Sequence, residues 1–320
     1  MRLVIAMPVR NDWQAAWQLC CQIDLVLREE RDVHASVLWI DDGSLRRATS
    51  ADIRTELQAL ERISVLELRR NLGHQRAIAV ALAYLQQRMN ADGVVLMDAD
   101  GEDPPEQILT LVKAGQRAEG PVAVFAERGK RLQTLVFRAF YQIYRLAHHV
   151  LTGRDIRFGN FSYVPWCFLE TLVVFPELWN HYAATFIKSG LPYVRVRVDR
   201  AKRLTGRSQM NFVDLVVHGL SGLFANQEIV GTRVLIMILL GSLTLVSGLA
   251  AAGAAELSTV RGFPVWLAIV AGLLVLLAGQ ALIAAFVLVF SITMNRSQLG
   301  FLPIRDYAHF IRREATLFER

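Results

Sequence analysis

The sequence predicts an α/β domain, built on a mainly parallel sheet with helices on both faces, followed by two membrane-spanning helices. Three observations support this prediction. Short runs rich in Val and Ile alternate with longer amphipathic stretches over residues 1–130, polar motifs follow several of these runs, and two later stretches are nearly free of charge. Continuous apolar strands that alternate with helices are typical of a parallel sheet that is buried on both faces.

Five apolar runs supply the expected strands. They cover residues 3–9, 36–40, 63–68, 93–97 and 121–125. Amphipathic stretches such as 74–90 and 105–119 supply helices between them. Ligands of such sheets bind beyond the carboxyl ends of the strands, which is where the polar motifs of this chain fall.

The composition restricts the class of protein. The chain has 320 residues, of which 53% are hydrophobic and 20% are charged. These values exclude a disordered chain, a collagen-like chain and a small disulfide scaffold. The net charge of +6 favours nucleic acid, anionic lipid or a phosphorylated ligand as partner. The three cysteines, Cys20, Cys21 and Cys167, have no metal-ligand spacing and favour a reducing compartment.

Two apolar stretches, residues 234–255 and 264–294, are each longer than the roughly 20 residues that cross a bilayer as a helix. Between them, Glu256 and Arg261 are the only charged residues of the region. The alternative is a pair of buried core helices, which is uncommon for stretches of this length without charge. Arginines flank the two stretches on their outer sides, so the positive-inside rule predicts a hairpin with both ends in the cytoplasm.

These patterns divide the chain into four parts. We expect a cytoplasmic domain over residues 1–209, an amphipathic juxtamembrane helix over 210–232, a hairpin of two transmembrane helices over 233–295 and a basic cytoplasmic tail over 296–320. The expected location is therefore the inner (plasma) membrane, crossed more than once. The amphipathic residues are equally compatible with lying on the membrane surface and with packing against the domain.

The fourth apolar run ends in Asp98-Ala99-Asp100-Gly101-Glu102. Two carboxylates at i and i+2 beyond a buried strand can hold a divalent cation, which keeps several waters and is completed by substrate phosphates. An Asp-x-Asp pair also occurs by chance at a solvated strand end. Its place at the end of a buried strand favours the metal site.

Other strand ends carry further polar motifs. The first run ends in residues 8–12 (Pro-Val-Arg-Asn-Asp), the second in 41–44 (Asp-Asp-Gly-Ser) and the third in 70–75 (Arg-Asn-Leu-Gly-His-Gln). The first strand is not followed by G-x-G-x-x-G, and the chain contains no G-x-x-x-x-G-K-[ST]. A dinucleotide site and a P-loop ATPase are therefore not expected.

Together these motifs resemble those of family 2 glycosyltransferases of the GT-A fold. The group they match best is the polyprenyl-phosphate glycosyltransferases, which includes dolichol-phosphate mannose synthase and bactoprenol glucosyltransferases. The matching segments are residues 8–12, 41–44, 70–73 and 98–106, where Asp12 replaces a glutamate and Gly101-Glu102 replace Leu-Gln. This group commonly carries two C-terminal transmembrane helices, and the resemblance covers essentially the whole chain.

The resemblance implies roles for particular residues. Asp98 and Asp100, with Glu102, would bind Mg²⁺ or Mn²⁺ at the nucleotide diphosphate. Residues 203–209 resemble a loop that grips phosphate, although Gln209 stands in the place of a lysine. Catalytic roles are implied for Asp100, Arg203, Arg128 and Arg131, and substrate-binding roles for Pro8, Asn11, Asp12, Asp42, Asn71, Asp98, Asn160, Arg207 and Ser208. The alternative for each arginine is attraction to anionic lipid.

One departure concerns catalysis. Many relatives have a Gly-Asp-Phe-Arg element whose aspartate is proposed as the base, whereas this chain has Gly159-Asn160-Phe161-Ser162. An amide cannot accept the proton. A phosphate monoester has a second pKa near 6, so a lipid phosphate is already mostly a dianionic nucleophile at neutral pH.

The expected function is therefore the transfer of one sugar from a nucleotide-sugar, most simply a UDP-sugar, to a polyprenyl (undecaprenyl or dolichyl) phosphate, with inversion and with a divalent metal. The expected partners are these two substrates, the lipid bilayer and further copies of the chain, but not nucleic acid. Three alternatives stay open: a processive synthase, although its Gln-x-x-Arg-Trp element is absent; a transferase acting on another lipid or glycan; and a non-catalytic membrane scaffold with a degenerate domain.

Overall fold

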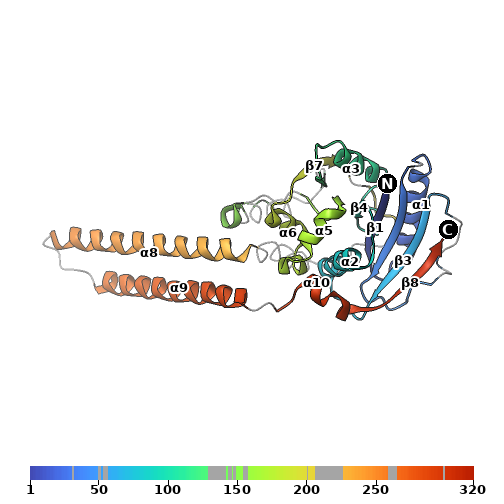
Figure 1. The fold of residues 1–320 in the computed structure, drawn as a ribbon. Coiled ribbons are helices and arrows are strands. Elements are labelled where there is room, and N and C mark those ends of the chain that lie inside the picture. Colours follow the sequence, from blue (N-terminus) through green and yellow to red (C-terminus); the bar gives the residue numbers. More distant parts are fainter. Residues whose placement is uncertain are drawn as a thin grey trace. The chain divides into compact units, whose positions relative to one another are not determined.

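The computed structural model describes residues 1–30, 32–49, 52, 57–128, 142, 146, 149–153, 158–199, 201–205, 226–258, 265–297 and 300–320 (Figure 1). It contains two compact units. The first comprises residues 1–138, 156–225 and 300–320, and the second comprises 139–155 and 226–299.

The described part of the first unit is built on an eight-stranded sheet with the order β7-β5-β6-β4-β1-β2-β3-β8. Its strands are β1 (Arg2–Val9), β2 (His34–Asp41), β3 (Leu60–Leu68), β4 (Gly93–Leu96), β5 (Ala123–Arg128), β6 (Ser162–Pro165), β7 (Tyr193–Val198) and β8 (Ile311–Glu319). Strands β4, β1, β2 and β3 are parallel neighbours, and β5 pairs parallel with β7. The antiparallel strands are β6 and β8.

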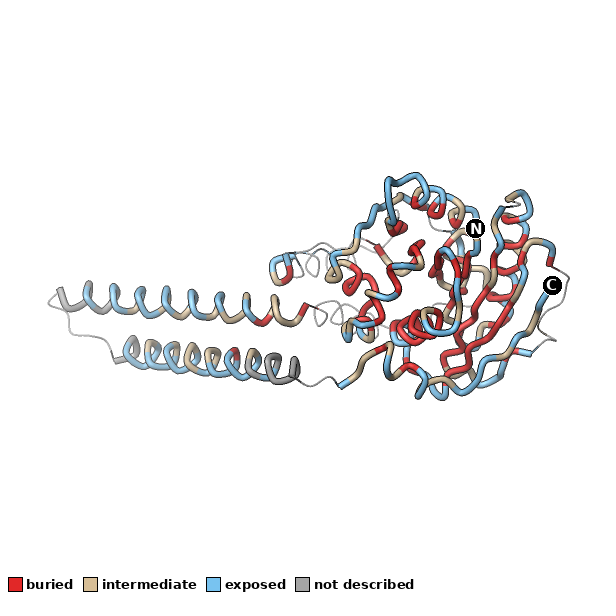
Figure 2. Tube along the Cα trace, in the orientation of Figure 1, coloured by how far each residue is buried: buried red, intermediate tan, exposed pale blue. Residues whose placement is uncertain are grey.

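Helices cover both faces of this sheet, as the apolar runs predict. Ile5 and Met7 of β1 pack with α1 (Trp13–Leu27) and α3 (Glu106–Gln116). Val4 and Ala6 face the other way and pack with α2 (His74–Arg88), α5 (Leu169–Leu172) and α6 (Tyr182–Ser189). Figure 2 shows the central strands as buried. The predicted α/β fold with a mainly parallel sheet is confirmed.

The C-terminal residues add the strand at the other edge of the sheet, where the sequence predicts a basic tail. After α10 (Pro303–Asp306) and η4 (Tyr307–Phe310), β8 pairs antiparallel with β3. Arg313 lies 2.6 Å from Glu67, which is 2% exposed, and Tyr84 donates a hydrogen bond to Glu314. Arg313 and Glu314 of this segment are therefore partners for side chains of β3 and α2.

The second unit contains two long apolar helices, α8 (Gln227–Ser258) and α9 (Val265–Ser297), which lie side by side and antiparallel in Figure 1. Their segments Gln227–Ala251 and Ala268–Val289 are long and apolar enough to cross a membrane. Large apolar side chains along them are exposed, for example Leu243 and Phe286. Buried core helices would not leave such side chains exposed, so the helices fit the predicted hairpin and membrane association.

Asp24 provides a test of the packing between α1 and β3. Its carboxylate is fully buried, and Oδ1 accepts hydrogen bonds from the backbone N–H groups of Gln58, Ala59 and Leu60 at 2.9, 2.7 and 3.0 Å. Burial works to raise the pKa of Asp24, but these bonds and the Arg28 guanidinium outweigh it and lower the pKa below its usual value.

We expect Asp24→Ala to destabilise the full-length protein by about 3 kcal/mol, because three N–H groups lose their acceptor. Thermal and chemical denaturation in detergent measure this loss, with Asp32→Asn, an exposed acidic residue, as the control.

A lowered carboxyl pKa contributes stability above the unfolded pKa of about 3.9, and this contribution is lost as the pH falls through the lower folded value. The difference in the free energy of unfolding between wild type and Asp24→Asn must therefore become smaller below about pH 4. A constant difference down to pH 2 would contradict the lowered pKa of Asp24.

Candidate active site

The loops after β1 and β2 are joined by hydrogen bonds at the carboxyl edge of the sheet. The Asn11 backbone N–H donates to Ser44 Oγ at 2.9 Å, and the Leu45 N–H donates to Asn11 Oδ1 at 2.7 Å. Asn11 has a φ of 56°, in the left-handed region that asparagine adopts more readily than most residues. Asn11 therefore holds the second loop against the first, and its predicted contact with substrate stays a prediction.

Asp42 joins the second loop to the third. Its Oδ1 accepts from the Leu72 N–H at 2.6 Å, and its Oδ2 accepts from the Gly73 N–H at 2.9 Å. The side chain is buried, and burial raises the pKa of the Asp42 carboxyl although the two N–H groups work to lower it. Asn71 Oδ1 also accepts from the Gly73 N–H. Asp42 thus fixes where α2 begins.

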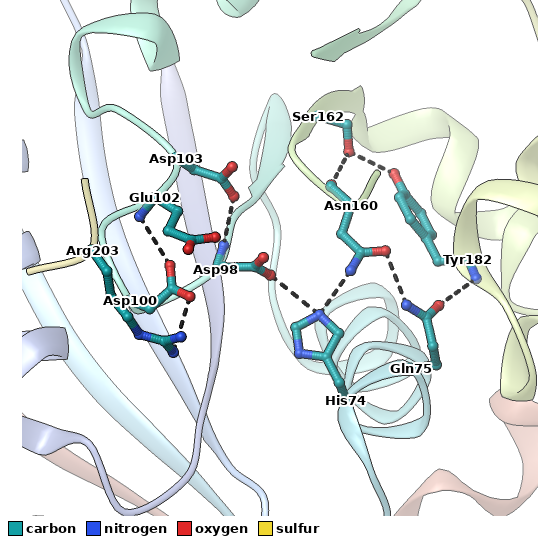
Figure 3. Close-up of polar contacts among 10 residues, drawn as sticks. All are labelled: His74, Gln75, Asp98, Asp100, Glu102, Asp103, Asn160, Ser162, Tyr182 and Arg203. Carbon is teal, nitrogen blue, oxygen red and sulfur yellow. Dashed lines mark hydrogen bonds and ion pairs between the residues drawn. The ribbon is translucent and has the colours of Figure 1, made fainter. Parts of the chain in front are cut away.

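The acidic loop after β4 is shaped by its own carboxylates (Figure 3). Asp103 is 2% exposed, and its Oδ2 accepts from the Asp98 N–H at 3.0 Å. Asp100 Oδ1 accepts from the Glu102 N–H at 2.9 Å. Gly101 between them has a φ of 82°, where a β-carbon is unfavourable. The carboxylates of Asp98, Asp100 and Glu102 gather at this one strand end.

Residues 201–205, which we term the strap, lie along this acidic loop. The Ala201 N–H donates to the Glu102 carbonyl at 3.1 Å, and the Leu204 N–H donates to the Asp100 carbonyl at 2.9 Å. At the end of the strap, Thr205 Oγ1 donates to Asp12 Oδ1 at 2.9 Å. The strap therefore connects the loop after β4 with the loop after β1.

Arg203 of the strap carries the positive charge at this site. Its Nη2 lies 3.1 Å from Asp100 Oδ2, and the two side chains are 25% and 17% exposed. Its Nε is buried and has no hydrogen-bond partner among the described residues. A buried N–H donor without a partner is uncommon in folded proteins. The guanidinium therefore has a donor left for a ligand beside the carboxylates.

His74, the first residue of α2, reaches the same carboxylates from the other side. Its Nε2 lies 3.2 Å from Asp98 Oδ1 and 2.8 Å from Asn160 Nδ2 (Figure 3). Desolvation of the ring works to lower its pKa, but the negative charge of Asp98 and its hydrogen bond to the ring, followed by the charges of Asp42 and Asp100, outweigh desolvation, so the pKa of His74 is raised. Its position directly after the Arg-Asn-x-Gly motif does not by itself mark His74 as a site residue in the sequence.

The donor atoms at this edge fit a hard divalent cation. Among the described residues, no three His, Cys, Asp or Glu side chains form a ready-made metal centre. Two neighbouring carboxylates suit Mg²⁺ or Mn²⁺, which take oxygen ligands and commonly complete their shell with water and substrate phosphates. The partnerless Nε of Arg203 beside Asp100 suits a phosphate oxygen.

The predicted site residues mostly come together. Those at the edge of the sheet are Pro8, Asn11, Asp12, Asp42, Asn71, Asp98, Asp100, Glu102 and Arg203, and Asn160 reaches them through His74. Arg128 ends β5, and its side chain is not described. Arg131, Arg207 and Ser208 lie outside the described residues. Spacing along the chain does not distinguish four further residues of this edge, His74, Gln75, Asp103 and Thr205, because single polar side chains at loop ends follow no characteristic pattern.

Comparison with known proteins assigns the family. The model of glycosyl transferase family 2 matches residues 5–168, which run from within β1 through β6 and include all the carboxylates of the acidic loop. This chain belongs to glycosyl transferase family 2. The resemblance found in the motifs is thereby confirmed, and with it the prediction of a glycosyltransferase.

Two curated relatives illustrate what the chain is similar to. It is 29% identical over 150 residues to the uncharacterized glycosyltransferase YkcC of Bacillus subtilis, a match that covers 47% of this chain and 43% of the relative. It is 24% identical over 223 residues to the undecaprenyl-phosphate 4-deoxy-4-formamido-L-arabinose transferase of Photorhabdus laumondii, covering 67% of this chain and 65% of the relative. The matches thus span less than half of the first relative's length and just under two thirds of the second's.

Among solved structures, the mannosyltransferase PcManGT of Pyrobaculum calidifontis, in complex with GDP-Man and Mn²⁺, is 18% identical and has a TM-score of 0.44. The match covers 90% of this chain and 86% of that one.

Gly101 tests the contact between the acidic loop and the strap. A β-carbon there would lie 2.4 Å from Leu204 Cγ, and the positive φ is itself unfavourable for alanine. We expect Gly101→Ala to displace the strap and to increase hydrogen–deuterium exchange at Ala201 and Leu204 by roughly 5-fold, which corresponds to about 1 kcal/mol. Gly120→Ala is the matched control, because nothing lies within 4 Å of its added β-carbon. Equal exchange in both variants would show that Leu204 does not hold the loop.

Proposed function

We propose that this protein is a membrane-anchored glycosyltransferase that depends on Mg²⁺ or Mn²⁺ and moves one sugar from a nucleotide-sugar, most simply a UDP-sugar, to a polyprenyl phosphate with inversion. The proposal depends on one observation: Arg203 pairs with Asp100, and its buried Nε–H donor has no partner among the described residues. A cation and a guanidinium at one strand end suit a diphosphate, because both offset its negative charge and the guanidinium also donates hydrogen bonds to its oxygens.

The acidic loop is the proposed diphosphate site. Asp98 and Asp100, with Glu102 as third donor, would hold the metal, which when bound stabilises the negative charge on the departing nucleoside diphosphate. Arg203 would exchange its contact with Asp100 for phosphate oxygens. This exchange keeps the guanidinium paired with an anion throughout, so that no isolated charge is left in a partly buried place.

The loops after β1, β2 and β3 are the proposed nucleoside site. Pro8, Asn11, Asp12, Asp42 and Asn71 lie there, at the carboxyl ends of parallel strands where ligands of such sheets bind. Several of their polar atoms already serve loop-to-loop bonds, so their remaining acceptors and the backbone groups beside them would contact the ribose and base.

A phosphate acceptor explains how the reaction can proceed although Asn160 stands where a catalytic base is expected. A phosphate dianion attacks the anomeric carbon, a phosphate oxygen–carbon bond forms, and the bond to the nucleoside diphosphate breaks with its electron pair leaving on the diphosphate. No proton has to be removed, because the second pKa of a phosphate monoester is about 6. A neutral hydroxyl acceptor would instead need a base. Arg128, Arg131, Arg207 and Ser208 are the proposed contacts of the acceptor and donor phosphates.

The membrane supplies the acceptor in this proposal. Helices α8 and α9 expose large apolar side chains over lengths that suit a bilayer. A polyprenyl phosphate presents its charged group at the membrane surface, so anchoring keeps the enzyme in the plane in which its acceptor diffuses. The arginines that flank the apolar segments favour the cytoplasmic side, where nucleotide-sugars are found.

Transfer is tested with the purified full-length protein, undecaprenyl phosphate, Mn²⁺ and a panel of radiolabelled UDP- and GDP-sugars. We expect one donor to yield a lipid-linked sugar and Asp100→Asn to reduce the rate on the order of 100-fold or more, since charge stabilisation in the transition state is lost. Asp32→Asn, an exposed carboxylate next to β2, is the matched control and should retain full activity. No product from any donor would refute the proposal; transfer to diacylglycerol alone would identify a different acceptor.

The membrane orientation is tested by fusions to alkaline phosphatase, which is active only outside the cytoplasm. We expect activity when the enzyme is fused after Ser258, at the end of α8, and none when it follows Arg320. A green fluorescent protein fused at the same two points should show the reverse pattern. Equal phosphatase activity at both points would exclude the hairpin.

A further inference from the structure

His74 is held by a chain of amides that begins in the core. The backbone N–H of Tyr182 donates to Gln75 Oε1 at 2.7 Å, and both residues are buried. Gln75 Nε2 then donates to Asn160 Oδ1 at 3.1 Å, and Asn160 Nδ2 lies 2.8 Å from His74 Nε2 (Figure 3). The chain therefore runs from a buried backbone group to an imidazole at the proposed active site.

The backbone group fixes the orientation of both side-chain amides. A backbone N–H can only donate, so the Gln75 atom that faces Tyr182 must be the oxygen, and the NH₂ group must face Asn160. The Asn160 atom that accepts from it must likewise be the oxygen. Asn160 consequently presents its NH₂ group to His74 Nε2, and an aspartate at this position could not donate in the same way.

This orientation decides which ring nitrogen of His74 is available. Nε2 lies 2.8 Å from Asn160 Nδ2 and 3.2 Å from Asp98 Oδ1. When the neutral ring accepts from Asn160 at Nε2, its hydrogen is on Nδ1. When the ring is protonated, Nε2–H donates to Asp98 in place of that contact, and Nδ1 again carries a hydrogen. Figure 3 shows Nδ1 directed away from Asn160 and Gln75. Nδ1 has no hydrogen-bond partner in the part of the chain that the structure describes, and the side chain is 42% exposed.

We propose that the Nδ1–H of His74 binds a phosphate oxygen of a substrate, with Gln75 and Asn160 as positioning residues that hold the ring. The inference rests on the proposed function for the presence of phosphate at this edge. The ring lies beside Asp98, so a group held by a cation at Asp98 and Asp100 comes within its reach. Asn160 then has a role in this protein that needs no proton transfer.

Two phosphates offer this chemistry, the diphosphate of the donor and the phosphate of the lipid acceptor. Isothermal titration of the full-length protein in detergent, with Mn²⁺ present, measures the affinity for UDP and GDP and, separately, for uridine and guanosine. Steady-state kinetics measure KM for undecaprenyl phosphate. The nucleosides serve as an internal control, because they share the base and ribose but have no phosphate.

We expect His74→Ala to weaken binding of the substrate whose phosphate it contacts by about 10-fold, the usual effect of removing a hydrogen bond to a charged group. A contact with the donor lowers nucleotide affinity and leaves nucleoside affinity unchanged. A contact with the acceptor leaves both unchanged and raises KM for undecaprenyl phosphate at nearly unchanged kcat. Asn160→Leu should give a smaller effect of the same kind and add little to His74→Ala in the double variant, because it acts through the same ring.

His309→Ala, an exposed histidine of η4, is the matched control. Unchanged nucleotide affinity together with unchanged KM would overturn the proposal, as would an equal loss for nucleosides and nucleotides or additive effects in the double variant. Absence of nucleotide binding by the wild type would overturn it as well. Nucleotide binding that depends on His74 without any transfer to a lipid phosphate would instead contradict only the proposed function.

Discussion

Burial of the sheet on both faces determines where this protein can place polar chemistry. Ile5 and Met7 of β1 pack against one helical layer, while Val4 and Ala6 pack against the other. Neither face is free for a ligand, so the ends of the strands are the remaining place. Parallel pairing of β4, β1 and β2 then brings their carboxyl ends to one edge. The carboxylates after β4 and the loops after β1 and β2 meet there although they are far apart in the sequence.

The same edge must hold several loops in place while it concentrates negative charge. Asp42 and Asp103 are buried and accept backbone N–H groups, so their charge is used to fix the loops. Asp98 lies beside the imidazole of His74, and Asp100 pairs with the guanidinium of Arg203. Arg203 belongs to the strap, which also bonds to the acidic loop through its backbone. In the proposed complex, a diphosphate and its metal would replace the contacts of Asp98 with His74 and of Asp100 with Arg203. Ligand binding would then be coupled to the positions of the acidic loop and the strap.

The sequence was informative where one physical signal dominates. Buried parallel strands need continuous apolar runs, so β1 to β5 could be predicted from the runs alone. Strands β7 and β8 lie at the edges of the sheet and are rich in arginine, as in YVRVRV, and this pattern is also that of a solvated or membrane-proximal segment. The Asp-x-Asp pair could be identified as a candidate cation site from the sequence, because two carboxylates directly after a buried strand are typical ligands of a divalent cation. The bonds of Asn11, Asp42 and Thr205 depend on how loops meet in space, which no spacing along the chain records. The meaning of Asn160 likewise became clear only beside Gln75 and His74.

The central claim is that the strand-end carboxylates and Arg203 together receive a metal and a nucleoside diphosphate. A crystal structure of the full-length protein with Mn²⁺ and UDP or GDP, recorded at a wavelength at which manganese scatters anomalously, tests it most directly. The account predicts an anomalous peak in contact with the carboxylate of Asp98 or Asp100 and with the diphosphate, and a guanidinium of Arg203 turned from Asp100 toward phosphate oxygens. A nucleotide bound elsewhere, or bound here with no manganese at these carboxylates and the Arg203–Asp100 pair intact, would contradict it.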